Sequence, residues 1–142
     1  EISLGLVGSE MCIREGIVTL FLATITAYAS SIQPYSNNVL TTNTTFSISS
    51  TGKATVSNTY SGITGTTKSA EIVTKVQKKV GIIWVTVNGG SWTDTSTSTN
   101  FSRSHSVQLS SKDTYRAHVV FTISGTGGSD DKITKNIEKT YS

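Results

Sequence analysis

Regular alternation of apolar and polar side chains is the sequence feature that most constrains the fold of this chain. In Thr114–Ile123 every second side chain is apolar, namely Tyr115, Ala117, Val119, Phe121 and Ile123. A period of two places such residues on one face of a pleated strand. Ser69–Lys79 alternates in nearly the same way, and no stretch after residue 29 has sustained helical periodicity. The pattern predicts an all-β protein.

Turn signals separate the alternating segments from one another. Ser50–Lys53, Val80-Gly81, Asn88–Gly90 and Ser124–Asp131 are rich in glycine or other turn-forming residues. These signals recur about every ten residues and predict about seven or eight short strands. We therefore predict a single antiparallel β-sandwich of immunoglobulin or fibronectin type, with a small barrel as the alternative.

Two of the predicted strands have features that the pattern alone leaves open. Ile82–Val87 is expected to pair with Ser69–Lys79 and to end at a hairpin turn over Asn88–Gly90, because Asn and Gly tolerate positive φ. Phe101–Leu109 alternates, but the face of Phe101 also carries Arg103 and His105, so its direction stays undecided.

Asp113-Thr114-Tyr115 begins a late strand and is similar to a tyrosine corner. In that arrangement a tyrosine hydroxyl hydrogen-bonds to backbone a few residues upstream and stabilises a Greek-key crossover. The alternative is an ordinary core tyrosine, and the sequence favours neither of the two.

The beginning of the chain has the pattern of an export signal. Gly16–Ile25 is a short apolar run, and Ala27-Tyr28-Ala29 has the small-x-small form of a signal peptidase site. The run is shorter than the roughly 20 apolar residues of a membrane-spanning helix, although an uncleaved anchor or a buried strand is the alternative. We expect a signal-peptide remnant over residues 16–29, which forms a helix, and an exported sandwich over residues 30–142.

Residues 6–14, LVGSEMCIR, resemble the translation of a sequencing adapter. On this interpretation residues 1–15 are an artefact, and Met11 and Cys12 are not part of the natural protein. The alternative is that Met11 is the start and the residues after it form a short basic segment of the signal. Cys12 is therefore not interpreted as a lipid anchor, nucleophile or metal ligand.

Composition limits the compartment and the kind of partner. Cys12 is the only cysteine, so residues 30–142 must fold by packing and hydrogen bonding without disulfides. The chain has 12 basic and 9 acidic residues. This mild positive balance suits anionic partners such as wall polymers, or serves solubility alone. We expect a secreted or extracellular, cell-surface protein of bacterial origin that contacts a membrane only through an uncleaved signal.

Several short motifs, taken in order, resemble a family of small exported proteins of unknown function from Gram-positive gut bacteria. They are Ile32-Gln33-Pro34, the segment Ser47–Thr55, Gln77-Lys78-Lys79 with Trp84, and Tyr115-Arg116 with Val119. Residues 80–92 are more apolar than the corresponding part of that family. The resemblance implies an exported sandwich, and it transfers no catalytic residue.

Catalytic and metal sites have little support in the sequence. His105 and His118 are the only histidine bases, and Asp94 or Asp113 could orient one of them, but no Gly-x-Ser-x-Gly motif is present. The few carboxylates lie mostly in turns or beside lysines, which does not suit a glycosidase pair. Asp130-Asp131 supplies too few oxygens for calcium and is interpreted as a solvated hairpin tip. Two histidines without cysteine do not predict a zinc site.

The remaining candidates for ligand or partner contact are two tryptophans and two arginines. Trp84 lies in an apolar strand and is expected in the core, whereas Trp92 follows a glycine turn and is expected to be either exposed or at the rim of the core. Arg103 and Arg116 contribute to a basic face, which solvation alone also explains. We predict a non-enzymatic surface or interaction module without a cofactor and without a nucleic-acid partner. The alternatives are a module that binds carbohydrate or anionic wall polymer and, less favoured, a small hydrolase.

Overall fold

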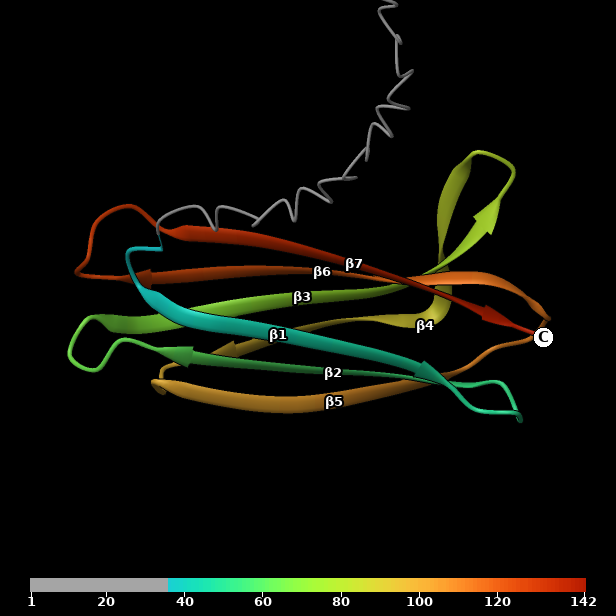
Figure 1. Ribbon diagram of the computed structural model, residues 1–142, viewed down its shortest axis with the longest axis horizontal. Helices are drawn as coiled ribbons and strands as arrows, with labels where there is room; N and C mark the ends of the chain where they lie inside the picture. The colour runs from blue at the N-terminus through green and yellow to red at the C-terminus, as the bar shows by residue number, and fades with distance from the viewer. Residues whose placement is uncertain (1–35) are drawn as a thin grey trace, which may run out of the picture. The chain divides into compact units, whose positions relative to one another are not determined.

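The computed structural model describes residues 36–142, which form two antiparallel sheets packed face to face (Figure 1). The strands are β1 (Val39–Ile48), β2 (Lys53–Gly62), β3 (Thr67–Val80), β4 (Ile83–Ser96), β5 (Asn100–Gln108), β6 (Asp113–Gly125) and β7 (Asp131–Tyr141). One sheet has the order β1-β2-β5 and the other β4-β3-β6-β7. The expectations for residues 1–15, the signal helix over 16–29 and the segment around Pro34 lie outside the described residues.

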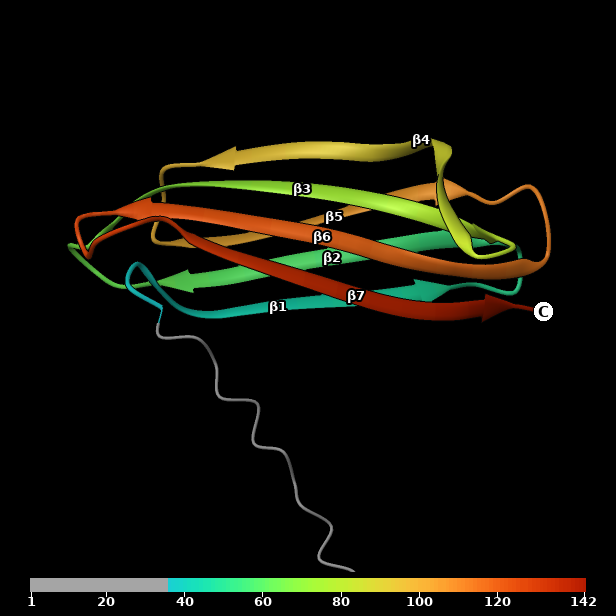
Figure 2. The same cartoon turned by 90° about the horizontal axis from the view of Figure 1, so that it is seen from above.

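The predicted β-sandwich is confirmed, with seven strands and no helix in residues 36–142. Viewed from above, the two layers lie one behind the other with their strands roughly aligned (Figure 2). The fourth strand pairs with the third, whereas in constant-type immunoglobulin domains the fourth strand joins the sheet of the first, second and fifth.

The core is formed by the alternating side chains that the sequence places on one face of each strand. The five alternating apolar side chains of β6, from Tyr115 to Ile123, are fully buried, and Phe46, Val56 and Ile72 of other strands belong to the same cluster. Phe101 and Val107 of β5 pack against the same cluster. The face of β5 that the sequence left undecided therefore points inward.

Polar side chains also bridge the two sheets inside the core. Asn58 on β2 donates from Nδ2 to Thr74 Oγ1 on β3 at 2.8 Å, and its Oδ1 accepts from Thr44 Oγ1 on β1 at 2.9 Å. All three side chains are buried, and within residues 36–142 no buried side-chain polar atom lacks a partner. The bridge therefore joins the sheets without leaving an uncompensated polar group.

The tyrosine corner is present at the beginning of β6. Tyr115 is almost completely buried, and its hydroxyl donates to the backbone carbonyl of Ser111 at 2.7 Å. The hydrogen bond connects the strand to the loop that crosses from the other sheet. Between the two alternatives left open by the sequence, the structure shows the corner.

We expect Tyr115→Phe to lower the free energy of unfolding by about 1 kcal/mol, because the ring stays packed while the Ser111 carbonyl loses its donor. Urea denaturation measures the change. Tyr141→Phe, at the partly exposed end of β7, is the control and should change stability by less than about 0.5 kcal/mol. Equal effects of the two substitutions would contradict the corner.

The predicted hairpin turn over Asn88–Gly90 is wrong, because β4 continues through these residues to Ser96. Lys75 pairs with Ser91 and Gln77 pairs with Thr86, so that residues 87–90 of β4 lie opposite Val76 alone. This arrangement is a β-bulge of several residues, and Gly89, with φ of +72°, provides the backbone conformation that it needs. The strand bends here, and the ends of β3 and β4 form a separate hairpin that projects from the sandwich (Figure 1).

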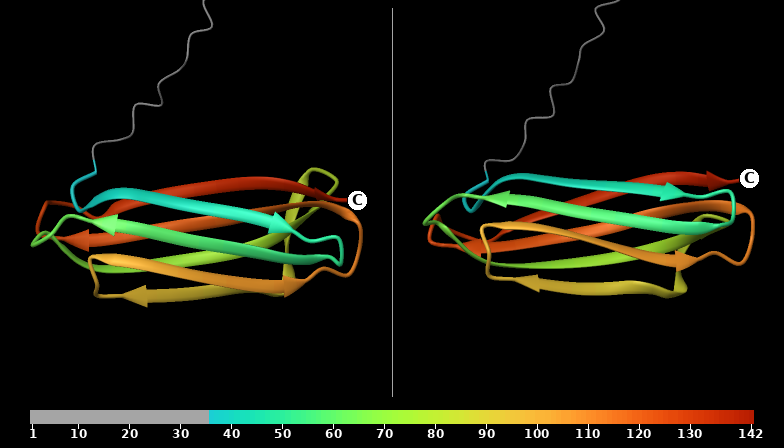
Figure 3. Two further views of the ribbon diagram at one scale, coloured as in Figure 1. Left: turned by 60° about the horizontal axis from the view of Figure 1, so that its bottom comes forward. Right: turned by 90° about the horizontal axis from the view of Figure 1, so that it is seen from below.

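The interpretation of Asp131 as part of a solvated tip is also wrong. Its buried carboxylate accepts hydrogen bonds from the backbone amides of Asn37, Asn38 and Val39 at 2.7–3.1 Å. Asn38 is buried as well, and its side chain bonds to Gly127 and Ser129 in the β6–β7 loop. The beginning of β1 is thereby attached to β7, which lies beside it along one side of the sandwich (Figure 3).

We expect Asp131→Asn to cost about 2 kcal/mol of stability, since an amide offers one acceptor oxygen where the carboxylate offers two and carries a charge. The neighbouring exposed residue supplies a matched control, Asp130→Asn, which should be nearly neutral. Urea denaturation of both variants makes the comparison, and a neutral Asp131→Asn would contradict the role assigned to the carboxylate.

Candidate functional site

A cluster of aromatic and charged side chains lies where the edge strands β4 and β5 of the two sheets meet (Figure 3). His105 on β5 contacts Asp94 on β4, with 2.7 Å between Nε2 and Oδ2. The indole of Trp92 stacks on the His105 ring, with 4.9 Å between centroids and 8° between planes. Arg103 is 3.6 Å from the other Asp94 oxygen. The structure thus brings two of the predicted contact residues, Trp92 and Arg103, to one place.

The contacts within this cluster connect the two sheets. Asp94 is almost buried, His105 is mostly buried, and Trp92 packs against the core cluster. The carboxylate accepts a hydrogen bond from the imidazole while the stacked rings cover the edge of the core. Since His105 covers one face of the Trp92 ring, little of the indole is left as an open platform for a sugar.

The two histidines lie on different sheets and make hydrogen bonds to different kinds of side chain. His118 is on the outer face of β6, where Nδ1 hydrogen-bonds to Asn136 Oδ1 at 2.8 Å. Within residues 36–142, the hydrogen bond of His105 runs to Asp94 and not to a hydroxyl group. The described residues therefore contain a histidine–carboxylate pair with no serine or threonine hydroxyl hydrogen-bonded to its imidazole, and a triad needs all three groups.

Asp94→Ala should lower the free energy of unfolding by about 1.5 kcal/mol, because it leaves the His105 imidazole without its partner in a mostly buried place. Arg103→Ala removes the other contact of the same carboxylate. Arg103 is 60% exposed, so its loss should cost less than about 0.5 kcal/mol. Thermal and urea unfolding of the two variants test this prediction. A larger loss of stability in Arg103→Ala than in Asp94→Ala would contradict a structural role of the His105–Asp94 contact.

The second candidate region is the hairpin formed by residues 77–86 at the ends of β3 and β4, hereafter the β3–β4 hairpin. Its ladder pairs Gln77 with Thr86 and ends with Val80 opposite Ile83. Gly81 has φ of +61° and Ile82 does not have positive φ, which is the pattern of a two-residue type II′ turn. The tight turn predicted at Val80-Gly81 is present one residue later, at Gly81 and Ile82, because Val80 still pairs with Ile83, and its tip is apolar.

Exposed aliphatic side chains are concentrated in this hairpin. Val80 is 49% exposed, Ile82 97%, Ile83 57% and Val85 46%. In residues 36–142 the one other large hydrophobic side chain with comparable exposure is Leu40, on β1. The sequence showed the apolar run and predicted that it pairs with Ser69–Lys79, but it did not indicate that these aliphatic side chains are exposed.

Trp84 lies in the hairpin and not in the core, so its expected burial is wrong. It is not among the hydrophobic side chains that form or border the core, and its ring lies over the Arg116 guanidinium, 4.4 Å from Cζ to the ring centroid. Lys79 Nζ is 5.9 Å from the same centroid. Trp84 is absent from the core because the bend at residues 87–90 turns this part of β4 away from the sandwich.

Two polar contacts hold the base of the hairpin against the rest of the sheet. Arg116 donates from Nε to Gln77 Oε1 at 2.8 Å. Lys78 forms an ion pair with Asp113 at 3.0 Å, and its hydrogen bond, together with that of the Thr114 amide, holds the pKa of Asp113 below its ordinary value of 3.8. Because the folded-state pKa is lowered, the pair is complete at neutral pH and is lost only in acid below that value.

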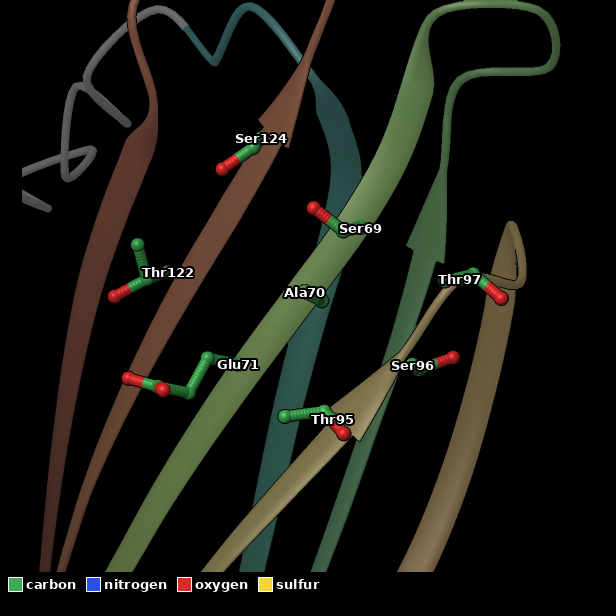
Figure 4. Close-up of a pocket in the computed structure, with 8 residues that line it drawn as sticks. All are labelled: Ser69, Ala70, Glu71, Thr95, Ser96, Thr97, Thr122 and Ser124. Carbon is green, nitrogen blue, oxygen red and sulfur yellow. The ribbon is translucent and has the colours of Figure 1, made fainter.

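A shallow depression of about 510 Å³ lies on the same sheet, over β3, β4 and β6 at the end away from the hairpin (Figure 4). It is lined by Ala70, by the Glu71 carboxylate and by hydroxyl side chains, namely Ser69, Thr95, Ser96, Thr97, Thr122 and Ser124. Glu71 extends toward Thr122, its partner on β6 (Figure 4). The lining has no aromatic side chain and no base paired with the carboxylate, so the depression offers neither a stacking surface nor a catalytic pair.

Residues 36–142 contain no group of three or more His, Cys, Asp or Glu side chains placed to hold a metal ion. A search of the same residues for a helix long and apolar enough to cross a membrane also found none. Comparison of the chain with protein-family models, curated proteins and solved structures gave no match. The resemblance to the exported family therefore stays a prediction.

Proposed function

We propose that this chain is an exported, non-enzymatic sandwich module that binds an extracellular partner, and that the β3–β4 hairpin is its contact element. Export is supported by the apolar run 16–25 and the Ala27-Tyr28-Ala29 site. The observation that carries the contact role is the projecting apolar tip, with four neighbouring aliphatic side chains about half to fully exposed.

Folding alone does not account for this tip. Hairpin turns usually carry Gly, Asn, Asp or Ser, which satisfy the backbone at no cost in exposed apolar area. Here Ile82 occupies a turn position and is 97% exposed, so it adds nothing to the core. A contiguous exposed apolar patch is characteristic of an interaction surface, and it is also an aggregation hazard unless something covers it.

The other proposals have less support from the contacts of the described residues. Carbohydrate binding through Trp92 would need an open ring face, and His105 covers one of them. Hydrolysis through His105 would need a nucleophile in contact with it. Binding of an anionic wall polymer through Lys79 and Arg116 agrees with their charge, but leaves the exposed aliphatic side chains unexplained.

The test is binding of the full chain, labelled at its single cysteine, to washed Gram-positive cells. We expect Ile82→Ser/Ile83→Ser to lower the bound fraction about tenfold or more, because the apolar area of the tip is lost. Urea denaturation should show little change in its stability, since both side chains are mostly exposed.

Leu40→Ser is the matched control, because Leu40 is a similarly exposed aliphatic residue outside the hairpin, and its binding should equal that of the unaltered chain. Trp92→Ala tests the carbohydrate alternative in the same assay. Binding that survives the double substitution, or that Trp92→Ala alone abolishes, would contradict the contact role of the hairpin.

A further inference from the structure

We infer that the partner of the β3–β4 hairpin is an anionic lipid bilayer, and that the hairpin tip inserts into its interface. This inference rests on the proposed function, because it names the partner of the same contact element. It differs from the expectation that the chain touches a membrane only through its signal. Three properties of the hairpin support it, namely its shape, its backbone hydrogen bonding and the charges at its base.

The shape of the hairpin suits a partner that surrounds the tip. The hairpin projects away from the layers of the sandwich (Figure 1), and Ile82 at its turn is almost completely exposed. A flat protein surface would cover one side of such a projection, whereas the disordered boundary between lipid headgroups and acyl chains closes around all sides. Aliphatic and tryptophan side chains are typical of elements that lie at this depth.

The backbone of the tip is paired across its own ladder. Residues 77–80 pair with residues 83–86, and Gly81 and Ile82 close the ladder in a tight turn. Insertion into the hydrocarbon region is costly for every unpaired amide or carbonyl group, and the outward-facing groups along the edges of a two-stranded hairpin have no partner in the ladder. The tip is therefore suited to the hydrated headgroup interface, where water satisfies these groups, and not to the hydrocarbon core.

Cations surround the base of the tip at the level of Trp84. Arg116 and Lys79 lie beside the indole ring, and Lys78, which is paired with Asp113, precedes Lys79 on β3. Tryptophan together with Lys or Arg is the combination found at membrane–water interfaces. At the same end of the sheet, Lys112 and Lys139 add positive charge, against the carboxylates of Asp113 and Glu138. This excess of positive charge is complementary to anionic headgroups.

A second copy of the chain does not offer a matching surface within residues 36–142. Apart from the hairpin, the large exposed hydrophobic side chain is Leu40, which stands alone on β1, and the depression over β3, β4 and β6 is lined by hydroxyl groups. Two hairpins packed tip to tip would bring the cations beside each Trp84 close together. The described residues therefore favour a lipid surface over self-association.

The test uses the full chain with Trp92→Phe, so that Trp84 is the only tryptophan and reports on the hairpin itself. We expect a blue shift of its emission on vesicles of phosphatidylglycerol and phosphatidylcholine in equal parts, and quenching by brominated acyl chains. Binding of the apolar run 16–25 to the vesicles would leave Trp84 emission unchanged. On pure phosphatidylcholine the shift should be much weaker, because the electrostatic attraction is missing.

Matched substitutions are made in the same background. Ile82→Ser/Ile83→Ser should abolish the shift and the quenching, and Leu40→Ser should preserve both. Lys79→Gln should weaken binding about fivefold at low salt, as expected for one cation near an anionic surface. Lys132→Gln, at the opposite end of β7, should leave binding unchanged.

Absence of a shift on anionic vesicles, or an equal shift on neutral ones, would overturn the inference. So would vesicle binding that depends on Lys79 but not on Ile82 and Ile83, because it would show electrostatic adsorption to the headgroups without insertion of the tip. If the hairpin variant loses cell binding while Trp84 never responds to vesicles, the contact role stands and the lipid partner is refuted. If the variant keeps its cell binding, the proposed function itself fails.

Discussion

The hydrogen-bonded bridge from Thr44 through Asn58 to Thr74 joins the two sheets inside their common core. Cys12 is the only cysteine, so no disulfide within the chain can link the layers. Apolar packing supplies most of the stabilisation, but packing is not directional and tolerates sliding of one sheet over the other. A buried amide that must find both partners allows one alignment of the sheets, because any other leaves it unpaired at a cost of about 1–3 kcal/mol. The bridge therefore fixes how the two sheets are aligned, and the contacts between their edge strands depend on this alignment.

Each side of the sandwich is then closed by a carboxylate. Asp131 holds the beginning of β1 against β7 through three backbone amides, and Asp94 joins β4 to β5 through His105. Asp131 contacts main-chain amides, whereas Asp94 contacts the His105 imidazole, on which the Trp92 indole is stacked. The sequence allowed Asp94 to orient a histidine and Asp131 to belong to a calcium loop, and it favoured neither role. Their observed partners explain them as structural groups, and this leaves the β3–β4 hairpin as the one prominent feature that the sandwich does not require.

The parts of the structure that local pattern controls were predictable from the sequence. The period of two in β6 fixes which side chains enter the core. The position of Tyr115 at its beginning left a tyrosine corner and an ordinary core tyrosine equally open, and the hydrogen bond to Ser111 decides for the corner. The contacts of Asp131, Asp94 and Asn58 were not predictable, because each joins residues far apart in the chain whose pairing depends on the completed fold. The prediction of a turn over Asn88–Gly90 failed for a different reason. These residues have the composition of a turn, but the positive φ of Gly89 forms a bend inside β4, and this bend places Trp84 outside the core. Of the four candidate contact residues, the structure groups Trp84 with Arg116 and Trp92 with Arg103, a division that the sequence could not show.

The bend connects the fold to the proposed contact. The irregularity at residues 87–90 turns the ends of β3 and β4 away from the layers of the sandwich (Figure 1). Arg116 holds the base of this hairpin through Gln77 and the Trp84 ring. The apolar tip is thus presented on a support that is already ordered, so binding need not order the hairpin backbone at the same time. Substitutions in the tip should change binding without changing stability, whereas substitutions in the bridge or at the two carboxylates should change stability first. This separation follows from where the side chains make their contacts, and it distinguishes a docking element from an accidental exposure of apolar residues.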